Sequence, residues 1–372
     1  MRLIHIADLH AGKTLGRLSR NPDLAHALEQ VVAFAKDSRA DAVLVAGDVF
    51  DKANPDNESK ELIFDFFLRL KDIGCEAIVI SGNHDSYDFM KSISGLTRLA
   101  NVHIFDRPSK DNCIYSLGDV AIACLPYPSE RVLTPADEDS KRSYGELVAR
   151  FITYLAQRAR SLSDKTILLA HLFVAGSRYT NTEKVASVTL HYAVQPSSLE
   201  GFDYVALGHV HRYQRIETAP VPAYYTGSMF QLDFSEAGEE KFFNFIVFDE
   251  DLKVEKIKVD QKIELKEVSI KQDEVSYQMG KLKTGHNYLK INLYLENKTT
   301  AGSLLEMIKK DLGEKLVRIE LITEGERTPE PEFQEEHLNP IEIYRLYYQQ
   351  NHGGDLPPDL EKTFVEILKE AE

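Results

Sequence analysis

The chain has 372 residues, of which 43% are hydrophobic and 28% charged, and this composition is typical of a globular protein with two or three domains. The formal net charge of −15 argues against a protein that coats nucleic acid through charge alone. The acidic excess is uneven, because the stretch from Pro329 to Glu372 is strongly acidic and the rest of the chain only mildly so.

The compartment is predicted to be the cytoplasm. No apolar run approaches the roughly 18 residues that a transmembrane helix needs. The N-terminal stretch from Met1 to Asp8 has the pattern of a strand rather than of a signal peptide. Three cysteines at unpatterned spacing, Cys75, Cys113 and Cys124, are expected to be reduced core residues.

Residues 1–110 alternate between strand and helix patterns, which predicts a parallel sheet covered by helices. Short apolar runs indicate strands, and apolar residues at helical spacing indicate the helices between them. The expected strands are Arg2–Ala7, Ala42–Ala46 and Glu76–Ile80, and the expected helices are Asp23–Ser38, Glu58–Ile73 and Tyr87–Leu99.

The helix around Glu61–Lys71 is apolar over much more of its circumference than one sheet face requires. One interpretation is that neighbouring elements of the same chain bury it. The other is that its second face packs against another subunit.

Residues 111–260 are predicted to form the second half of a layered sandwich. The expected helix is Tyr144–Leu162, and a hairpin over Phe242–Val259 turns at Asp249–Asp251. The other expected strands are Val120–Leu125, Lys165–Ala170, Phe202–Leu207 and Tyr224–Gly227.

The remaining chain is predicted to contain a small domain and a tethered tail. Residues 261–325 combine two strand patterns with a helix, and residues 326–339 read as a linker rich in Glu and Pro. Residues 340–372 are expected to form two short amphipathic helices. These helices either fold back on this chain or bind a partner.

Polar side chains with metal-binding chemistry follow the expected strands. Because the carboxyl ends of parallel strands meet at one edge of a sheet, these side chains are expected to converge. Carboxylate, imidazole and amide ligands together indicate a binuclear site suited to Mn(II), Fe(II) or Zn(II). The candidates are Asp8, His10, Asp48, Asn83, His84, His171, His209 and His211, and Asp48 is central in their order.

Five motifs, taken together, resemble those of the calcineurin-like metallophosphoesterases. They are Asp8-Leu9-His10, Gly47-Asp48-Val49-Phe50-Asp51, Gly82-Asn83-His84-Asp85, the isolated His171, and Gly208-His209-Val210-His211. Within that superfamily, the stretches His171–Val174, Tyr204–His211 and Tyr225–Ser228 resemble the SbcD-type nucleases of DNA double-strand break repair.

The resemblance implies a role for each motif residue. Asp8, His10, Asp48 and His211 would hold one metal ion. Asp48, Asn83, His171 and His209 would hold the other, with Asp48 bridging the two. His84 would stabilise or protonate the leaving oxygen, and Asp85 would orient His84. The role of Asp51 stays open, and Leu9 stands where bacterial relatives often have Trp.

The resemblance also implies a fold and an activity. The fold is an α/β protein with a two-sheet αββα sandwich over residues 1–260, a small α/β capping domain that binds DNA, and C-terminal partner-binding helices. The activity is that of a nuclease with two Mn(II) ions, acting as a double-strand 3′–5′ exonuclease and a single-strand or hairpin endonuclease on DNA ends. An SMC-like ATPase of the SbcC type would bind residues 340–372. The resemblance also implies a homodimer through the helices near residues 60–100, which agrees with the apolar surface of the helix around Glu61–Lys71.

Two other functions remain open from the sequence. One is a phosphodiesterase for small nucleotides on the same fold, which would need neither the extra domain nor the tail. The other is a scaffold that positions an ATPase on DNA ends, which would need neither the ligand set nor His84.

Overall fold

A computed structural model describes residues 1–129, 143–180, 183, 192–296 and 301–323, together with ten positions between 341 and 364. Residues 1–322 form one compact unit and residues 323–372 a second. The expected linker at 326–339 lies outside the described residues, as does most of the expected helical segment at 340–372. Among the described residues, no helix is long and apolar enough to cross a membrane.

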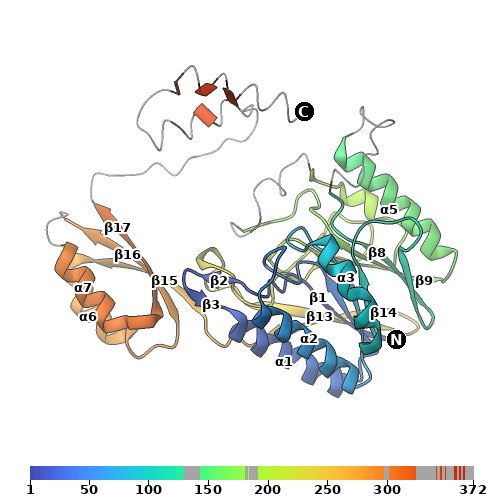
Figure 1. Ribbon diagram of the computed structural model, residues 1–372, viewed down its shortest axis with the longest axis horizontal. Helices are drawn as coiled ribbons and strands as arrows, with labels where there is room; N and C mark the ends of the chain where they lie inside the picture. The colour runs from blue at the N-terminus through green and yellow to red at the C-terminus, as the bar shows by residue number, and fades with distance from the viewer. Residues whose placement is uncertain are drawn as a thin grey trace. The chain divides into compact units, whose positions relative to one another are not determined.

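Two six-stranded sheets lie face to face (Figure 1). The first has the order β14-β13-β1-β4-β5-β6 and the second the order β11-β12-β10-β9-β8-β7. The first sheet is built from β1 (Arg2–Ile6), β4 (Ala42–Ala46), β5 (Glu76–Ile80), β6 (Val102–Phe105), β13 (Lys241–Phe248) and β14 (Leu252–Val259). The second is built from β7 (Ile114–Leu117), β8 (Val120–Leu125), β9 (Lys165–His171), β10 (Tyr204–Gly208), β11 (Gln214–Arg215) and β12 (Ala223–Tyr225).

Helices cover the outer faces of both sheets, so the expected αββα sandwich is confirmed. On the first sheet lie α1 (Asn21–Ser38), α2 (Asn57–Asp72) and α3 (Tyr87–Thr97), followed by the short helix η1 (Arg98–Ala100). On the second sheet lies α5 (Tyr144–Arg160). Side chains cap three of these helices, since Asp56, Ser86 and Ser143 each accept a hydrogen bond from a first-turn backbone N–H.

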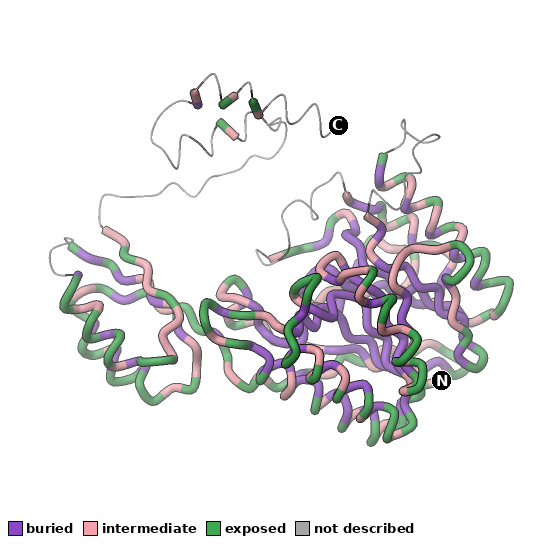
Figure 2. Tube along the Cα trace, in the orientation of Figure 1, coloured by how far each residue is buried: buried purple, intermediate pink, exposed green. Residues whose placement is uncertain are grey.

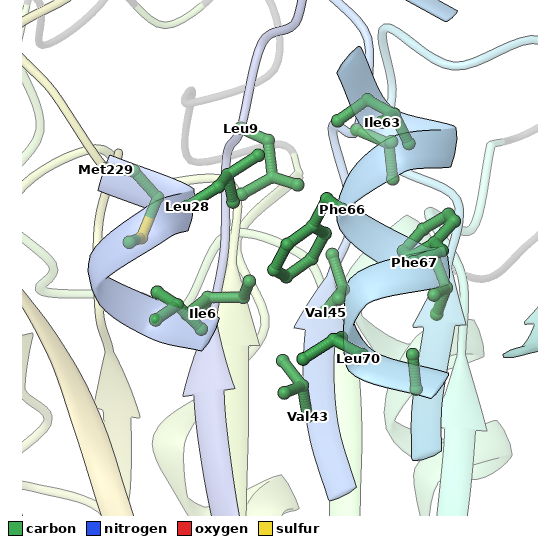
Figure 3. Packing of buried hydrophobic residues seen from close by; sticks show 14 of the residues in the cluster. Ile6, Leu9, Leu28, Val43, Val45, Ile63, Phe66, Phe67, Leu70 and Met229 are labelled. Carbon is green, nitrogen blue, oxygen red and sulfur yellow. The ribbon is translucent and has the colours of Figure 1, made fainter. Parts of the chain in front are cut away.

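Three hydrophobic clusters separate the layers. Figure 2 shows the buried strands at the centre of the sandwich and the exposed outer sides of its helices. The middle cluster lies between the sheets, and two of the strands that face it, β4 and β8, are buried along their whole length. The outer cluster under α2 is seen in Figure 3, where Phe66 and Leu70 point toward Val43 and Val45 of β4. All three cysteines are buried and free.

The hairpin β13–β14 was expected in the second half of the sandwich, and that prediction is wrong. β13 instead pairs antiparallel with β1, with Arg2 opposite Val247. The physical reason is that the edge of β1 is open until β13 occupies it, and pairing there satisfies its backbone groups.

Residues 265–323 build a three-stranded sheet with its own core. Within residues 1–322 this sheet is not separated as an independent unit. Helices α6 (Val275–Leu282) and α7 (Ala301–Leu312) pack on β15 (Leu265–Lys271), β16 (Tyr288–Leu295) and β17 (Leu316–Thr323). A small hairpin of β2 (Thr14–Leu15) and β3 (Leu18–Ser19) follows β1.

Candidate metal centre

The candidate ligands lie in the loops at the carboxyl ends of five parallel strands. In the first sheet β1, β4 and β5 are parallel neighbours, and in the second sheet β9 and β10 are parallel neighbours. Each strand delivers one of the motifs, and His171 is itself the last residue of β9. A hydrogen bond joins the two sheets at this edge, because His171 Nδ1–H donates to the carbonyl of Ala46 at 2.8 Å. All eight candidates therefore come from one end of the sandwich.

Four of the expected ligands form a first buried group. Asp8, His10, Asp48 and His211 each offer one ligand atom, and these atoms lie within 4.8 Å of one another. The Nε2 atoms of His10 and His211 are 3.2 Å apart, and His10 Nε2 is 3.7 Å from Asp48 Oδ2. This is the set that the family resemblance implied for one metal ion.

The other expected ligands form a second group around Asn83. Its Oδ1 lies 2.9 Å from His171 Nε2 and 2.8 Å from His209 Nδ1. His171 Nε2 is also 3.4 Å from Asp48 Oδ2. Asp48 thus reaches both groups, which is the position that a bridging carboxylate requires.

The residues present fit divalent cations. Asp8 Oδ2 is buried and has no hydrogen-bond partner among the residues that the structure describes. The Nδ1 atoms of His10 and His211 lie 3.3 and 3.5 Å from carboxylates, and their Nε2 atoms face each other at 3.2 Å. When both Nδ1 atoms carry the proton, both Nε2 atoms are free to coordinate a cation, and neutral imidazole with carboxylate suits transition metals.

Burial and neighbouring charges shift the pKa values of the ligands in opposite directions. Burial raises the pKa of Asp8 to about 6, even though His211 and His171 act to lower it. Burial also acts to raise the pKa of Asp48, but His171 and His10 hold it well below its usual value. Burial acts to lower the pKa of His171, but the Asp48 and Asp8 carboxylates raise that pKa to about 9. Asp48 also acts to raise the pKa of Asp8, and a cation between the two carboxylates would remove that repulsion.

His84 lies beside the first group but has a different ring partner from the one we expected. Its Nδ1 is 2.8 Å from the backbone carbonyl of Asp51, and its ring meets that of His10 edge to face at 4.8 Å. Asp85 was expected to orient His84. Its carboxylate instead accepts hydrogen bonds from the backbone N–H groups of Val49, Phe50 and Gly82, at 3.1, 3.0 and 2.8 Å. In this structure Asp85 connects the loop that carries Asp48 to the loop that carries Asn83, and the carbonyl of Asp51 contacts the His84 ring.

The backbone at the centre is strained. Among the described residues, six non-glycine residues have a positive φ, and four of them are the candidate ligands Asp8 (51°), His10 (46°), Asp48 (47°) and His209 (104°). Such conformations cost on the order of 1–3 kcal/mol each and persist only where the surroundings impose them. The close packing demands glycine as well, because a Cβ at Gly82 would lie 2.1 Å from Asp48 Oδ1.

The sequence patterns missed three side chains that approach the centre. Glu236 Oε1 lies 3.5 Å from His211 Nδ1, and Glu183 Oε1 accepts a hydrogen bond from His211 N–H at 2.9 Å. The ring of Tyr127 stacks near that of His209, with centroids 6.0 Å apart. Glu183 and Glu236 do not follow an expected strand, so the strand-end signal could not find them. Tyr127 does follow the expected strand Val120–Leu125, but its phenol ring is not a residue type of the metal-ligand pattern.

Comparison with known proteins adds a family and a relative. A model of the calcineurin-like phosphoesterase family matches residues 1–213. The chain is also 35% identical over 253 residues to the SbcD subunit of the nuclease SbcCD from Bacillus subtilis (strain 168). That match covers 65% of this chain and 64% of the relative, which is less than two thirds of the relative's length.

Solved structures with a similar arrangement are more distant. A dimetal phosphatase from Danio rerio has a TM-score of 0.48 and 14% identity, covering 70% of this chain and 97% of its own. The protein TT1561 of Thermus thermophilus has a TM-score of 0.42 and 15% identity, covering 68% and 98% of the two chains. Likenesses at this level carry no conclusion about function.

Proposed function

The chain belongs to the calcineurin-like phosphoesterase family, and from that premise we propose that it is the nuclease subunit of a DNA end-processing complex of the SbcCD type. The observation that carries the proposal is that two adjacent ligand groups share Asp48. A relative named as a nuclease subunit, 35% identical, supports DNA as the substrate.

We propose two Mn(II) ions as the cofactors. Ions bound by Asp8, His10, Asp48 and His211, and by Asp48, Asn83, His171 and His209, would activate water and clamp phosphoryl oxygens for in-line displacement. The protein's own contribution is to hold the ligands in fixed orientations. His171, for example, keeps its Nδ1 on the carbonyl of Ala46 and so turns Nε2 toward Asn83 and Asp48.

His84 is the proposed acid in phosphodiester cleavage. The contact of its Nδ1 with the carbonyl of Asp51 makes Nδ1 the donor and fixes the ring. Its backbone N–H donates to Asp48 Oδ1 at 2.8 Å, which places the ring beside the shared carboxylate. From there we propose that His84 stabilises or protonates the leaving oxygen of the scissile phosphodiester.

The proposed partners are DNA ends, an SMC-like ATPase and a second copy of this chain. The ATPase would bind residues 340–372 in a helix-in-groove contact. Two parts of that tail contact each other, since the rings of Tyr344 and Phe364 stack at 4.4 Å and Arg345 Nε donates to Glu361 at 3.1 Å. Such a preformed pair would present one surface to a partner.

The second copy would dock on the surface of α2, α3 and η1. Leu68 is 51% exposed, Leu96 72% and Leu99 74%, although Ile63, Phe66, Phe67 and Leu70 of α2 are buried. One side of α2 is thus buried by its own sheet, while Leu68 of α2, Leu96 of α3 and Leu99 of η1 leave large apolar side chains exposed to water. An apolar surface of this kind is typical of a subunit interface.

Hydrolysis of end-labelled duplex DNA with added Mn(II) tests the nuclease proposal. We expect the full chain to degrade the duplex from its 3′ ends and to cut hairpin and single-stranded DNA, and the variant Asp48→Asn to be inactive because both ligand groups lose their shared carboxylate. The variant Asp203→Asn is the control, since Asp203 lies at the opposite end of β10, beside Arg160 and Thr166. A wild type that spares DNA but hydrolyses a small phosphodiester would favour the small-nucleotide enzyme.

A chain lacking residues 329–372 separates partnered from unpartnered functions. A small-nucleotide phosphodiesterase would keep its full activity without the tail. The proposed subunit would keep its own hydrolysis and lose the ATPase in a pull-down. An ATPase that still binds the truncated chain would contradict the assignment of the tail, and a wild type inert on every phosphodiester while still binding the ATPase would favour a scaffold.

A further inference from the structure

A buried ion pair lies behind the candidate ligand His211. Glu236 has no exposed surface and Lys241 is 2% exposed, and their charged groups are 2.7 Å apart. Glu236 ends the short helix η5 (Phe234–Glu236), and Lys241 begins β13. Neither residue follows a strand end, and neither belongs to the five motifs.

The two carboxylate oxygens of Glu236 contact different groups. Oε2 accepts hydrogen bonds from Lys241 Nζ, from Ser228 Oγ at 3.1 Å and from Leu232 N–H at 3.0 Å. Those three donors fix the carboxylate in place. Oε1 lies 3.5 Å from His211 Nδ1, on the side of the ring opposite Nε2, the atom that faces His10.

The backbone of His211 is held by the same neighbourhood. Lys241 Nζ donates to the carbonyl of His211 at 3.3 Å, and Glu183 Oε1 accepts from its N–H at 2.9 Å. The ring, the carbonyl and the amide of one residue are thus restrained by three charged side chains. A buried ion pair is a poor source of stability, because removing two charges from water costs about as much as their attraction returns. Its placement suggests another role.

We propose that Glu236 is a positioning residue that orients the imidazole of His211 for metal binding, with Lys241 and Ser228 holding the glutamate in place. A carboxylate that receives Nδ1–H fixes the tautomer, so that Nε2 presents its lone pair to the ion. Glu236 does not touch the ion or the substrate. The inference rests on the metal centre of the proposed function and adds to it a residue outside the ligand set.

Titration of metal-free full-length protein with Mn(II), followed by calorimetry, tests the inference without any activity assay. In Glu236→Gln the amide has one oxygen, so it cannot accept both from His211 and from the three donors at Oε2. We expect one of the two Mn(II) affinities to fall by about 10- to 100-fold, the usual effect of losing such a partner, and the other to stay within about twofold.

Two further variants keep the result interpretable. Glu236→Gln/Lys241→Met leaves no unpaired buried charge, so it folds even if the single variant does not. Its affinity for one of the two Mn(II) ions should fall as in the single variant. Asp203→Asn should lose stability and bind both ions as wild type does. A double variant with two wild-type affinities would overturn the inference and make the pair structural only. A wild type that does not take up two ions would instead refute the metal centre itself.

Discussion

Replacing Asp85 by Asn should weaken the fold and the metal centre together. Asp85 is 8% exposed, and its two oxygens accept three backbone hydrogen bonds from loops that carry Asp48 and Asn83. An asparagine of the same shape has one oxygen, so at least one buried N–H faces an NH₂ group. A buried group left without a partner costs about 1–3 kcal/mol, and a hydrogen bond to a charged acceptor contributes about 1.5–3 kcal/mol.

From these values we expect Asp85→Asn to lower the free energy of unfolding by about 2–4 kcal/mol. Val49 adjoins Asp48 and Gly82 adjoins Asn83, so loss of these hydrogen bonds should let the two ligand-bearing loops move apart. We therefore expect the Mn(II) affinity to fall by about 10-fold or more, the usual effect of losing a contact that supports a ligand. Urea unfolding and Mn(II) titration measure the two effects.

The comparison with His84→Ala decides what Asp85 does. If Asp85 orients the ring of His84, then both variants should keep wild-type stability and metal affinity and lose only turnover. That result for Asp85→Asn would refute the reasoning from its three backbone contacts.

Three further predictions concern separate parts of the molecule. His84→Ala should bind both metal ions and turn over DNA about 10²- to 10⁴-fold more slowly, as measured by Mn(II) titration and DNA hydrolysis. A loss of metal affinity would instead identify His84 as a ligand. Burial lowers the pKa of His5 to about 3, so the unfolded chain alone takes up a proton there as the pH falls below about 6.5. Between pH 6.5 and 5 the free energy of unfolding of wild type should therefore fall by about 2 kcal/mol because of this residue, and His5→Gln should lack that fall. Urea unfolding at the two pH values measures it, and an equal fall in both proteins would contradict the prediction. Leu96→Glu/Leu99→Glu should convert a dimer into a monomer with unchanged unfolding, as measured by sedimentation, and a wild type that sediments as a monomer would contradict the proposed interface.

The sequence predicted the elements best where local pattern alone determines them. The strands Ala42–Ala46, Glu76–Ile80 and Val120–Leu125 have the expected bounds, because each is a short apolar run ended by turn residues. The convergence of the motif residues was also predictable, since parallel strands share an edge. The short strand β6, by contrast, was not predicted.

What the sequence could not predict depends on distant parts of the chain. The pairing of β13 with β1 joins residues far apart in sequence, and no local pattern indicates it. No local pattern indicates the contact of Glu236 with His211 either, in which Lys241 at the start of β13 holds the glutamate. The positive φ angles of Asp8, His10 and Asp48 likewise follow from the tertiary packing that imposes them.

The pairing of β1 with β13 also determines when, during synthesis, the first sheet can be completed. The start of β1 is bound to the end of β13, since the Met1 amino group donates to the carbonyl of Phe248 at 3.0 Å and Phe248 N–H donates to the carbonyl of Met1 at 2.8 Å. At about 5–20 residues per second, a ribosome needs roughly 12–50 seconds to make the chain between these two strands. During that interval β1 can pair with β4 on one side only, and its other edge is open to neighbouring nascent chains. Ribosomes spaced along one messenger would therefore hold several such edges at once, and β13 covers each of them only after the ribosome has passed Phe248.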